Sequence, residues 1–116
     1  MASMSGQVTR RISASPDQVF KALADPSRRR ILDILSREEL PLKRIQRRFQ
    51  LSRPALIKHI WILKSCSLVR VRRAGRMIYH RLNSRPLRTV EQWMAKYEVF
   101  WGDHLERLKH QAESEK

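Results

Sequence analysis

The chain has 116 residues, with 25 Lys and Arg against 11 Asp and Glu, and a formal net charge of +14. This length suits one domain, and 41% hydrophobic residues suffice for a core, which argues against a wholly disordered chain. The longest apolar run, residues 60–63, is far below the ~20 residues of a membrane span. The single cysteine, Cys66, excludes an internal disulfide and a cysteine-rich zinc site. We therefore expect a cytoplasmic protein without a membrane segment.

The basic residues are concentrated in one part of the chain. Residues 40–90 contain no Asp or Glu, whereas residues 91–116 hold four basic and six acidic residues. Such a stretch favours a polyanionic partner. A solvated basic face that only aids solubility is the simplest alternative. A membrane surface is a weaker one, because the charges run across several predicted elements. The basic residues of the stretch are Lys43, Arg44, Arg47, Arg48, Arg53, Lys58, Lys64, Arg70, Arg72, Arg73, Arg76, Arg81, Arg85 and Arg88.

Two short helices are expected after a mobile basic tail at 1–13, and we assign 14–116 to a single winged-helix domain. Ser15 and Gln18 form a capping box around Pro16, and Ala14 with Val19 is placed to form a hydrophobic staple. Asp25 caps the second helix, which starts at Pro26. Arg residues at 28–30 lie in its first turn, against the helix dipole.

The acid-free stretch predicts a helix-turn-helix followed by a wing. Pro41 opens a short helix at 41–49, residues 50–52 form a turn, and Ser52 caps a helix at 53–65. Apolar runs on either side of a tight turn at Ala74 and Gly75 predict a β-hairpin. A hairpin directly after a recognition helix is a wing. The fold class expected is therefore mainly α with a small β-hairpin, a winged helix-turn-helix.

A long helix at 86–112 closes the chain in this prediction, because apolar residues recur at three- and four-residue spacing. Its apolar face is wider than one small domain needs, which indicates a dimerisation helix. Gly102 costs this helix about 1 kcal/mol and has no evident reason. The dimerisation residues expected on this helix are Leu87, Val90, Met94, Tyr97, Trp101, Leu105 and Leu108.

The DNA-binding residues follow from the helix-turn-helix and the wing. We expect the start of the recognition helix to donate to phosphate and the wing arginines to hold the flanking backbone. Ile57 and Trp61 are unusual there: an apolar pair favours thymine methyl groups, and the alternative for Ile57 is packing against the helix at 41–49. The set is Ser52, Arg53, Pro54, Ala55, Ile57, Lys58, Trp61, Arg72, Arg73 and Arg76.

Residues 19–108 resemble the ArsR/SmtB family of bacterial winged-helix repressors. The resemblance is carried by FKALADPSRRRILDIL at 20–35, LSRPALIKHI at 51–60 and GRMIYHRL at 75–82. It implies a homodimer that forms through the first and last helices, binds a palindromic operator and blocks transcription. The first helix adds Val19, Phe20 and Leu23 to the expected dimerisation residues. The composition indicates only a basic helix-turn-helix, a wing and a dimer helix; "repressor" comes from the resemblance alone. An inducer or a partner protein of unknown identity stays open.

The metal ligands of the family are missing. Metal-sensing members carry a Cys-x-Cys type pair on the helix corresponding to 41–49, and this chain has no ligand there. On the last helix only Glu106 and His110 face together, and two ligands make a poor site. We therefore expect no metal and no cofactor. Cys66 is expected to be a buried small residue, and Ser67 stands where a helix-ending glycine is usual.

Two other function classes fit the sequence less well. An enzyme is disfavoured because the chain has no nucleophile elbow, no metal-ligand spacing and no phosphate loop. A nonspecific nucleic-acid-binding protein, architectural or RNA-binding, is the remaining alternative. RNA recognition favours aromatic residues on an exposed sheet, and only Tyr79 of the eight aromatic residues falls in the hairpin.

Overall fold

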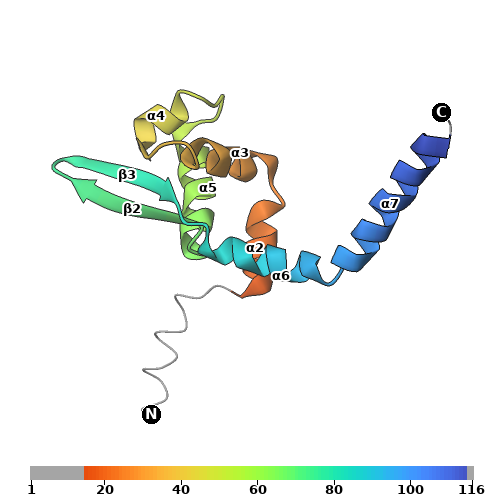
Figure 1. Cartoon of the computed structure of the whole chain (residues 1–116). Helices are drawn as coiled ribbons and strands as arrows, with labels where there is room; N and C mark the ends of the chain where they lie inside the picture. The colour runs from red at the N-terminus through yellow and green to blue at the C-terminus, as the bar shows by residue number, and fades with distance from the viewer. Residues whose placement is uncertain (1–14, 115–116) are drawn as a thin grey trace, which may run out of the picture.

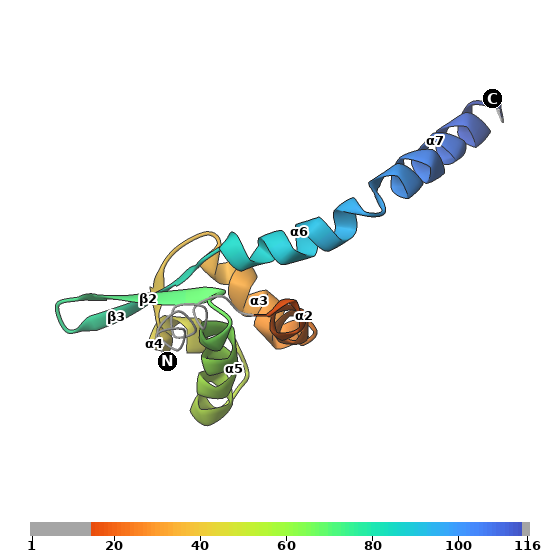
Figure 2. The ribbon, with the colours of Figure 1, turned by 90° about the horizontal axis from the view of Figure 1, so that it is seen from below.

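A computed structural model describes residues 15–114 of the chain. Helices α2 to α5 enclose the core, the β2–β3 hairpin projects from one side, and α6 and α7 lead away from the other (Figures 1 and 2). The mainly helical fold with a small antiparallel sheet is confirmed. The elements are α2 (Pro16–Leu23), α3 (Pro26–Leu35), β1 (Leu40–Pro41), α4 (Leu42–Gln46), α5 (Arg53–Ser65), β2 (Val69–Ala74), β3 (Met77–Leu82), the short helix η1 (Arg85–Leu87), α6 (Arg88–Ala95) and α7 (Glu98–Ser114).

The helix starts lie where the capping residues place them. The Ser15 hydroxyl accepts a hydrogen bond from the Gln18 N–H at 3.3 Å, and Gln18 Oε1 accepts from the Ser15 N–H at 3.0 Å, so the capping box is complete. Asp25 accepts from the Arg28 N–H at the start of α3. Ala14, the other half of the predicted staple, lies outside the described residues, as does the tail at 1–13.

The core lies where α3, α4 and α5 meet the sheet. Its fully buried side chains are Val19, Ile31, Leu40, Ile45, Leu56, Leu63, Cys66 and Leu68. The prediction that Cys66 is a buried small residue is confirmed. Val19, in contrast, is only 1% exposed. It belongs to the core of one chain and has no surface to offer a second, so its assignment to the dimer face is wrong.

Helix α5 ends in a Schellman motif built on Ser67. The Leu68 N–H donates to the Leu63 carbonyl at 2.9 Å and the Ser67 N–H to the Lys64 carbonyl at 3.0 Å, while Leu63 and Leu68 are both fully buried. Ser67 has a φ of 64°, in the left-handed region where glycine is favoured. The chain therefore turns from the recognition helix into β2 at a small conformational cost.

The sheet and the helix before it differ from the expected ones. The order is β1-β3-β2, and β1 pairs Leu40 with His80 and Pro41 with Tyr79. This two-residue strand is too short to show in a sequence pattern. The expected helix at 41–49 is only α4, since Pro41 lies in the strand and the backbone after Gln46 tightens into turns. In the hairpin Ala74 pairs with Met77, so the turn is Gly75-Arg76 and not Ala74-Gly75.

The predicted helix at 86–112 is divided into η1, α6 and α7. The break falls at residues 96–97, where the sequence has neither Pro nor Gly, and not at Gly102. Nothing lies within 4 Å of a Cβ built on Gly102, and the structure gives no reason for a glycine there. Every residue from 98 to 113 is exposed. Helix α7 therefore leaves the body with its apolar side chains uncovered (Figure 1).

Candidate nucleic-acid interface

Helix α5 has one buried side and one exposed side. Leu56, Ile60 and Leu63 face the core. Most of the DNA-binding residues predicted here are exposed: Ser52, Arg53, Pro54, Ile57, Lys58 and Trp61. Ala55 is half-buried. Ile57 is 45% exposed, so it is not part of the core and part of its side chain is open to a ligand.

The start of α5 offers fewer backbone donors than a typical helix N-terminus. Pro54 has no N–H, and the Ala55 N–H donates to the Ser52 hydroxyl at 3.2 Å. The groups left for an anion are the Ser52 hydroxyl hydrogen and the N–H groups of Arg53. Side chains, more than the helix dipole, therefore carry the positive character of this end.

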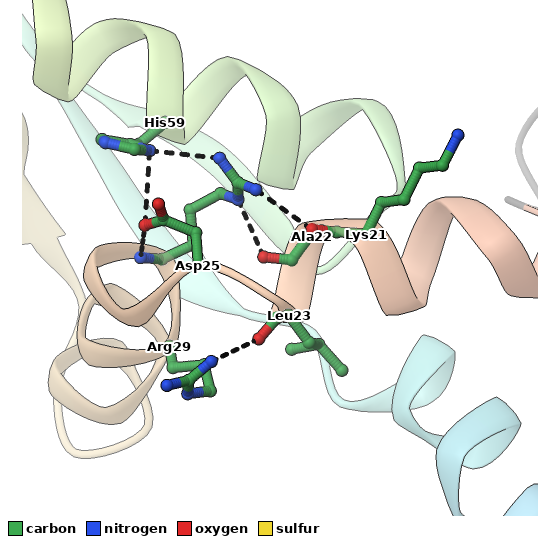
Figure 3. A network of polar contacts seen from close by, with 7 residues as sticks. Lys21, Ala22, Leu23, Asp25, Arg29 and His59 are labelled. Atoms are coloured by element: carbon green, nitrogen blue, oxygen red, sulfur yellow. Dashed lines mark hydrogen bonds and ion pairs between the residues drawn. The ribbon is translucent and has the colours of Figure 1, made fainter.

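A polar network ties α5 to the junction between α2 and α3 (Figure 3). Arg28 Nε donates to the Ala22 carbonyl at 2.8 Å, its second terminal nitrogen donates to the Lys21 carbonyl at 3.0 Å, and its first lies 3.3 Å from Nδ1 of His59 on α5. Arg29 donates to the Leu23 carbonyl at 2.8 Å. These guanidinium groups occupy the negative end of α2, which is favourable. The expectation that arginines at 28–30 only oppose the dipole of their own helix missed this contact.

Asp25 completes the network. Its carboxylate accepts from the Arg28 N–H at 3.0 Å and lies 3.8 Å from Nδ1 of His59. Burial alone would raise the pKa of the Asp25 carboxyl, but the Arg28 N–H and the charges of His59 and Arg28 lower it below its usual value. The carboxylate is thus held ionised between the recognition helix and the start of α3.

The three wing arginines do not have the same surroundings. Arg72 pairs with Glu39 through Nε and Oε2 at 2.5 Å, and its guanidinium lies 5.0 Å from the centre of the Tyr79 ring. Arg73 and Arg76 are exposed beside the turn, where Gly75 has a φ of 64°. That φ suits a type II′ turn, which takes glycine at its first central position. Arg73 and Arg76 are therefore the wing residues placed to reach a phosphate, whereas Arg72 is held by its own chain.

A groove joins the recognition helix to the wing, and its lining combines four basic side chains with six other residues: Pro41, Leu42, Val71, Met77, Ile78 and His80. Its volume is about 550 Å³, and it is lined by Arg53 at the start of α5 and Arg76 in the hairpin turn. Lys43 of α4 and Lys64 near the end of α5 add two positive charges to it. The sequence prediction of DNA contacts left out both lysines, although the absence of acidic residues from 40 to 90 was a signal that included them.

The predicted dimerisation residues meet on a different surface. A groove of about 560 Å³ is lined by Leu23, Leu87, Val90, Met94 and Trp101, which come from α2, η1, α6 and α7. Phe20 and Trp93 pack edge to face beside it, with ring centres 5.8 Å apart. Leu105 and Leu108 continue the apolar surface along α7, 62% and 49% exposed.

Within residues 15–114 no three His, Cys, Asp or Glu side chains are grouped as metal ligands would be. Glu106 and His110 share one hollow on exposed α7, lined otherwise by Arg107 and Gln111. None of the described helices is long and apolar enough to cross a membrane.

Comparisons with known proteins agree with this geometry. A family model described as a helix-turn-helix domain matches residues 23–72. The transcriptional repressor SdpR of Bacillus subtilis is 36% identical over 81 residues, which cover 70% of this chain and 90% of the relative. A solved ArsR-like transcriptional regulator from a Rhodococcus species covers 84% of this chain and 90% of its own, with 32% identity and a TM-score of 0.68.

The chain belongs to the ArsR/SmtB family. It is a DNA-binding transcriptional regulator with a winged helix-turn-helix, and not an enzyme. A further similar structure is a homodimeric winged helix-turn-helix DNA-binding domain from Mycobacterium bovis. It is 28% identical, with a TM-score of 0.56, and covers 84% of this chain and 86% of its own.

Proposed function

We propose that this ArsR/SmtB-family regulator is a cytoplasmic homodimeric repressor that binds an inverted-repeat operator without a metal effector. The observation that carries the proposal is the separation of two surfaces. The groove between α5 and the wing, with its four basic side chains, lies on one part of the molecule, and the groove of α2, η1, α6 and α7, which has none, lies on another. One surface suits DNA and the other a second copy of the chain.

On DNA, α5 enters the major groove and the wing follows the flanking backbone. Ser52 and Arg53 contact phosphate at the start of the helix, and Lys58 contacts phosphate or a base edge. Pro54 and Ala55 lie at the same helix start and approach the groove with it. Arg73 and Arg76 bind backbone phosphates beyond the helix.

The dimer forms through the groove of α2, η1, α6 and α7 and its continuation along α7. Its residues are the predicted ones without Val19: Phe20, Leu23, Leu87, Val90, Met94, Tyr97, Trp101, Leu105 and Leu108. Burying Trp101 and the two leucines of α7 removes a large apolar area from water, which favours association. Two copies of α5 then read half-sites about 34 Å apart.

Footprinting and sedimentation test this function together. We expect protection of an inverted repeat upstream of the gene for this protein, by a particle of twice the chain mass. Trp101→Glu should give a monomer with weakened operator binding. Val99→Glu is the matched control, because Val99 is 79% exposed and lies outside the apolar repeat on the same helix. Equal affinity for the repeat and a scrambled duplex would favour the nonspecific alternative, and a wild-type monomer would refute the dimer.

The absence of a metal effector has its own measurement. Operator affinity should be equal in chelator and in added zinc. A tenfold difference, about 1.4 kcal/mol, would reveal a metal site that the described residues do not form within one chain.

A further inference from the structure

Two large apolar side chains on the recognition helix are exposed to solvent. Trp61 is 66% exposed and Ile57 is 45% exposed. At about 100° per residue they lie some 40° apart around the α5 axis, one turn from each other. Neither belongs to the buried side of α5, which Leu56, Ile60 and Leu63 form: Trp61 lies about 130° around the axis from its centre and Ile57 about 90°. The core therefore does not account for this pair.

The proposed dimer does not account for it either. Helices α6 and α7 leave the body on the side away from α5, as two perpendicular views show (Figures 1 and 2). The grooves that gather the apolar residues of α6 and α7 include no residue of α5. A second copy bound there leaves Ile57 and Trp61 exposed.

The charges around the pair indicate what covers it. Lys58 is adjacent to Ile57 and, like Lys64, exposed on α5, and the helix has no acidic residue. A polyanion satisfies those cations, and it must also offer apolar groups to Ile57 and Trp61. In the major groove of DNA the C5-methyl group of thymine is the apolar contact point. An apolar protein surface would leave the lysines without partners.

We propose that Ile57 and Trp61 read thymine methyl groups in each operator half-site, an inference that rests on the proposed function. The two residues are about 6 Å apart along the helix axis, roughly two base-pair steps of ~3.4 Å. The pair thus selects thymines at two nearby positions, by shape and apolar contact in place of hydrogen bonds. Lys58 and Lys64 supply positive charge on either side of the pair and do not contact the methyl groups.

Replacing thymine by deoxyuridine tests this without changing the protein, since it removes the methyl group and leaves every hydrogen-bonding group of the base. The operator is first selected by the full-length protein from a random duplex pool. Each dT is then replaced singly by dU, and affinity is measured by fluorescence anisotropy. We expect one or two positions per half-site to lose about fourfold in affinity each, the factor that one buried methyl group supplies.

Variants then assign the methyl groups to side chains. Ile57→Ser and Trp61→Ala should each bind dT and dU operators equally at the position their own side chain contacts. Lys58→Ala is the matched control: it should weaken both operators by the same factor and keep the dT-to-dU ratio. Thermal unfolding of each variant checks that the fold is intact.

The outcomes separate the two proposals. A selected operator with no dU penalty at any position overturns the methyl readout and leaves the repressor proposal standing. A dU penalty that persists in the Ile57→Ser, Trp61→Ala double variant also overturns it, because other residues then read the methyl group. Failure to select any preferred sequence refutes sequence-specific binding itself, and the readout with it.

Discussion

Removing the two free arginines of the wing should change how operator binding responds to salt. Every phosphate that a protein ceases to neutralise lowers the slope of log affinity against log salt concentration by about 0.9. Arg73 and Arg76 are both exposed beside the hairpin turn. The variant Arg73→Ala, Arg76→Ala should therefore have a slope lower by about 1.8, for the operator and for a scrambled duplex alike.

That slope has a direct consequence for affinity. Between 50 mM and 200 mM salt the concentration rises fourfold, so the ratio of wild-type to variant affinity should fall by about twelvefold. Fluorescence anisotropy titrations at four or five salt concentrations measure both the slope and the ratio. The defect should be large at low salt and small at high salt.

Two control variants make the measurement specific to the wing. Arg107→Ala, Lys109→Ala removes the same charge from exposed α7 and should leave the slope unchanged. Arg72→Ala should change it by less than half a unit, because Arg72 is already paired with Glu39 and Tyr79. If the wing variant keeps the wild-type slope, or the α7 control lowers it equally, the wing does not hold the DNA backbone.

Three further predictions concern the folded chain. Ser67→Gly should stabilise the folded chain by about 0.5–1 kcal/mol in urea unfolding. Glycine removes the strain of the positive φ, but it also raises the conformational entropy of the unfolded chain, which offsets part of that effect. A less stable variant would contradict this. Burial lowers the pKa of His80, and the charge of Lys64 lowers it further, whereas the hydrogen bond to the Leu40 carbonyl raises it. The contribution of neutral His80 to the free energy of unfolding should therefore be complete above the ordinary pKa of 6.5 and decrease as the pH falls below it. His80→Asn, which keeps a donor for that carbonyl, should flatten this fall between about pH 7 and about pH 5, and an equal fall in both proteins would rule out His80. Burial raises the pKa of the Cys66 thiol, so a thiol reagent should modify it only as the chain unfolds, and rapid labelling of the native protein would show an opening near Cys66.

The sequence predicts the features that depend on neighbouring residues. Ser15 with Gln18, Asp25 and Ser52 each set a helix start within a few positions, and all three starts are where expected. Ser67 is likewise recognisable as an unfavourable helix end, because it stands at the position where a left-handed φ favours glycine. Patterns of this kind carry enough information because the interacting groups are only two or three residues apart.

Features that depend on distant residues do not show in the sequence. The strand β1 exists because Leu40 and Pro41 meet β3 some forty positions later. Arg72 has the sequence position of a DNA contact, and only the fold reveals its pairing with Glu39, thirty-three positions away. On a helical projection Ile57 fits either of its two interpretations, and only the packing of α4 and α5 decides between them.

The break at residues 96–97 also depends on packing that the sequence pattern does not show. A regular apolar repeat predicts a continuous helix only if something covers the apolar stripe along its whole length. In the single chain Leu87 and Val90 pack against the core and Phe20 packs against Trp93, whereas every residue from 91 to 113 is exposed. The apolar repeat thus extends over the surface that we propose a dimer buries, and within one chain only the start of that repeat is covered.

The Arg28 network gives the last prediction. Arg28→Ala removes a partly buried charged hydrogen bond to the Ala22 carbonyl, an exposed one to the Lys21 carbonyl and a partly buried contact with His59. Together these losses should cost about 2–3 kcal/mol. Arg29→Ala is the matched control: it removes one exposed hydrogen bond, to Leu23, and should cost about 1 kcal/mol or less. Urea unfolding of both variants measures the difference.

The acid response distinguishes this network from general packing. The pKa of Asp25 is lowered in the folded chain, so its contribution to stability is present above the ordinary value of 3.8 and is lost as pH falls below it. Arg28→Ala removes one of the charges that lower this pKa, so the variant should lose less stability than the wild type as the pH falls through this range. If Arg28→Ala costs no more than Arg29→Ala and leaves the acid response unchanged, the guanidinium does not hold α5 against the α2–α3 junction. The recognition helix would then be positioned by Leu56, Ile60 and Leu63 alone.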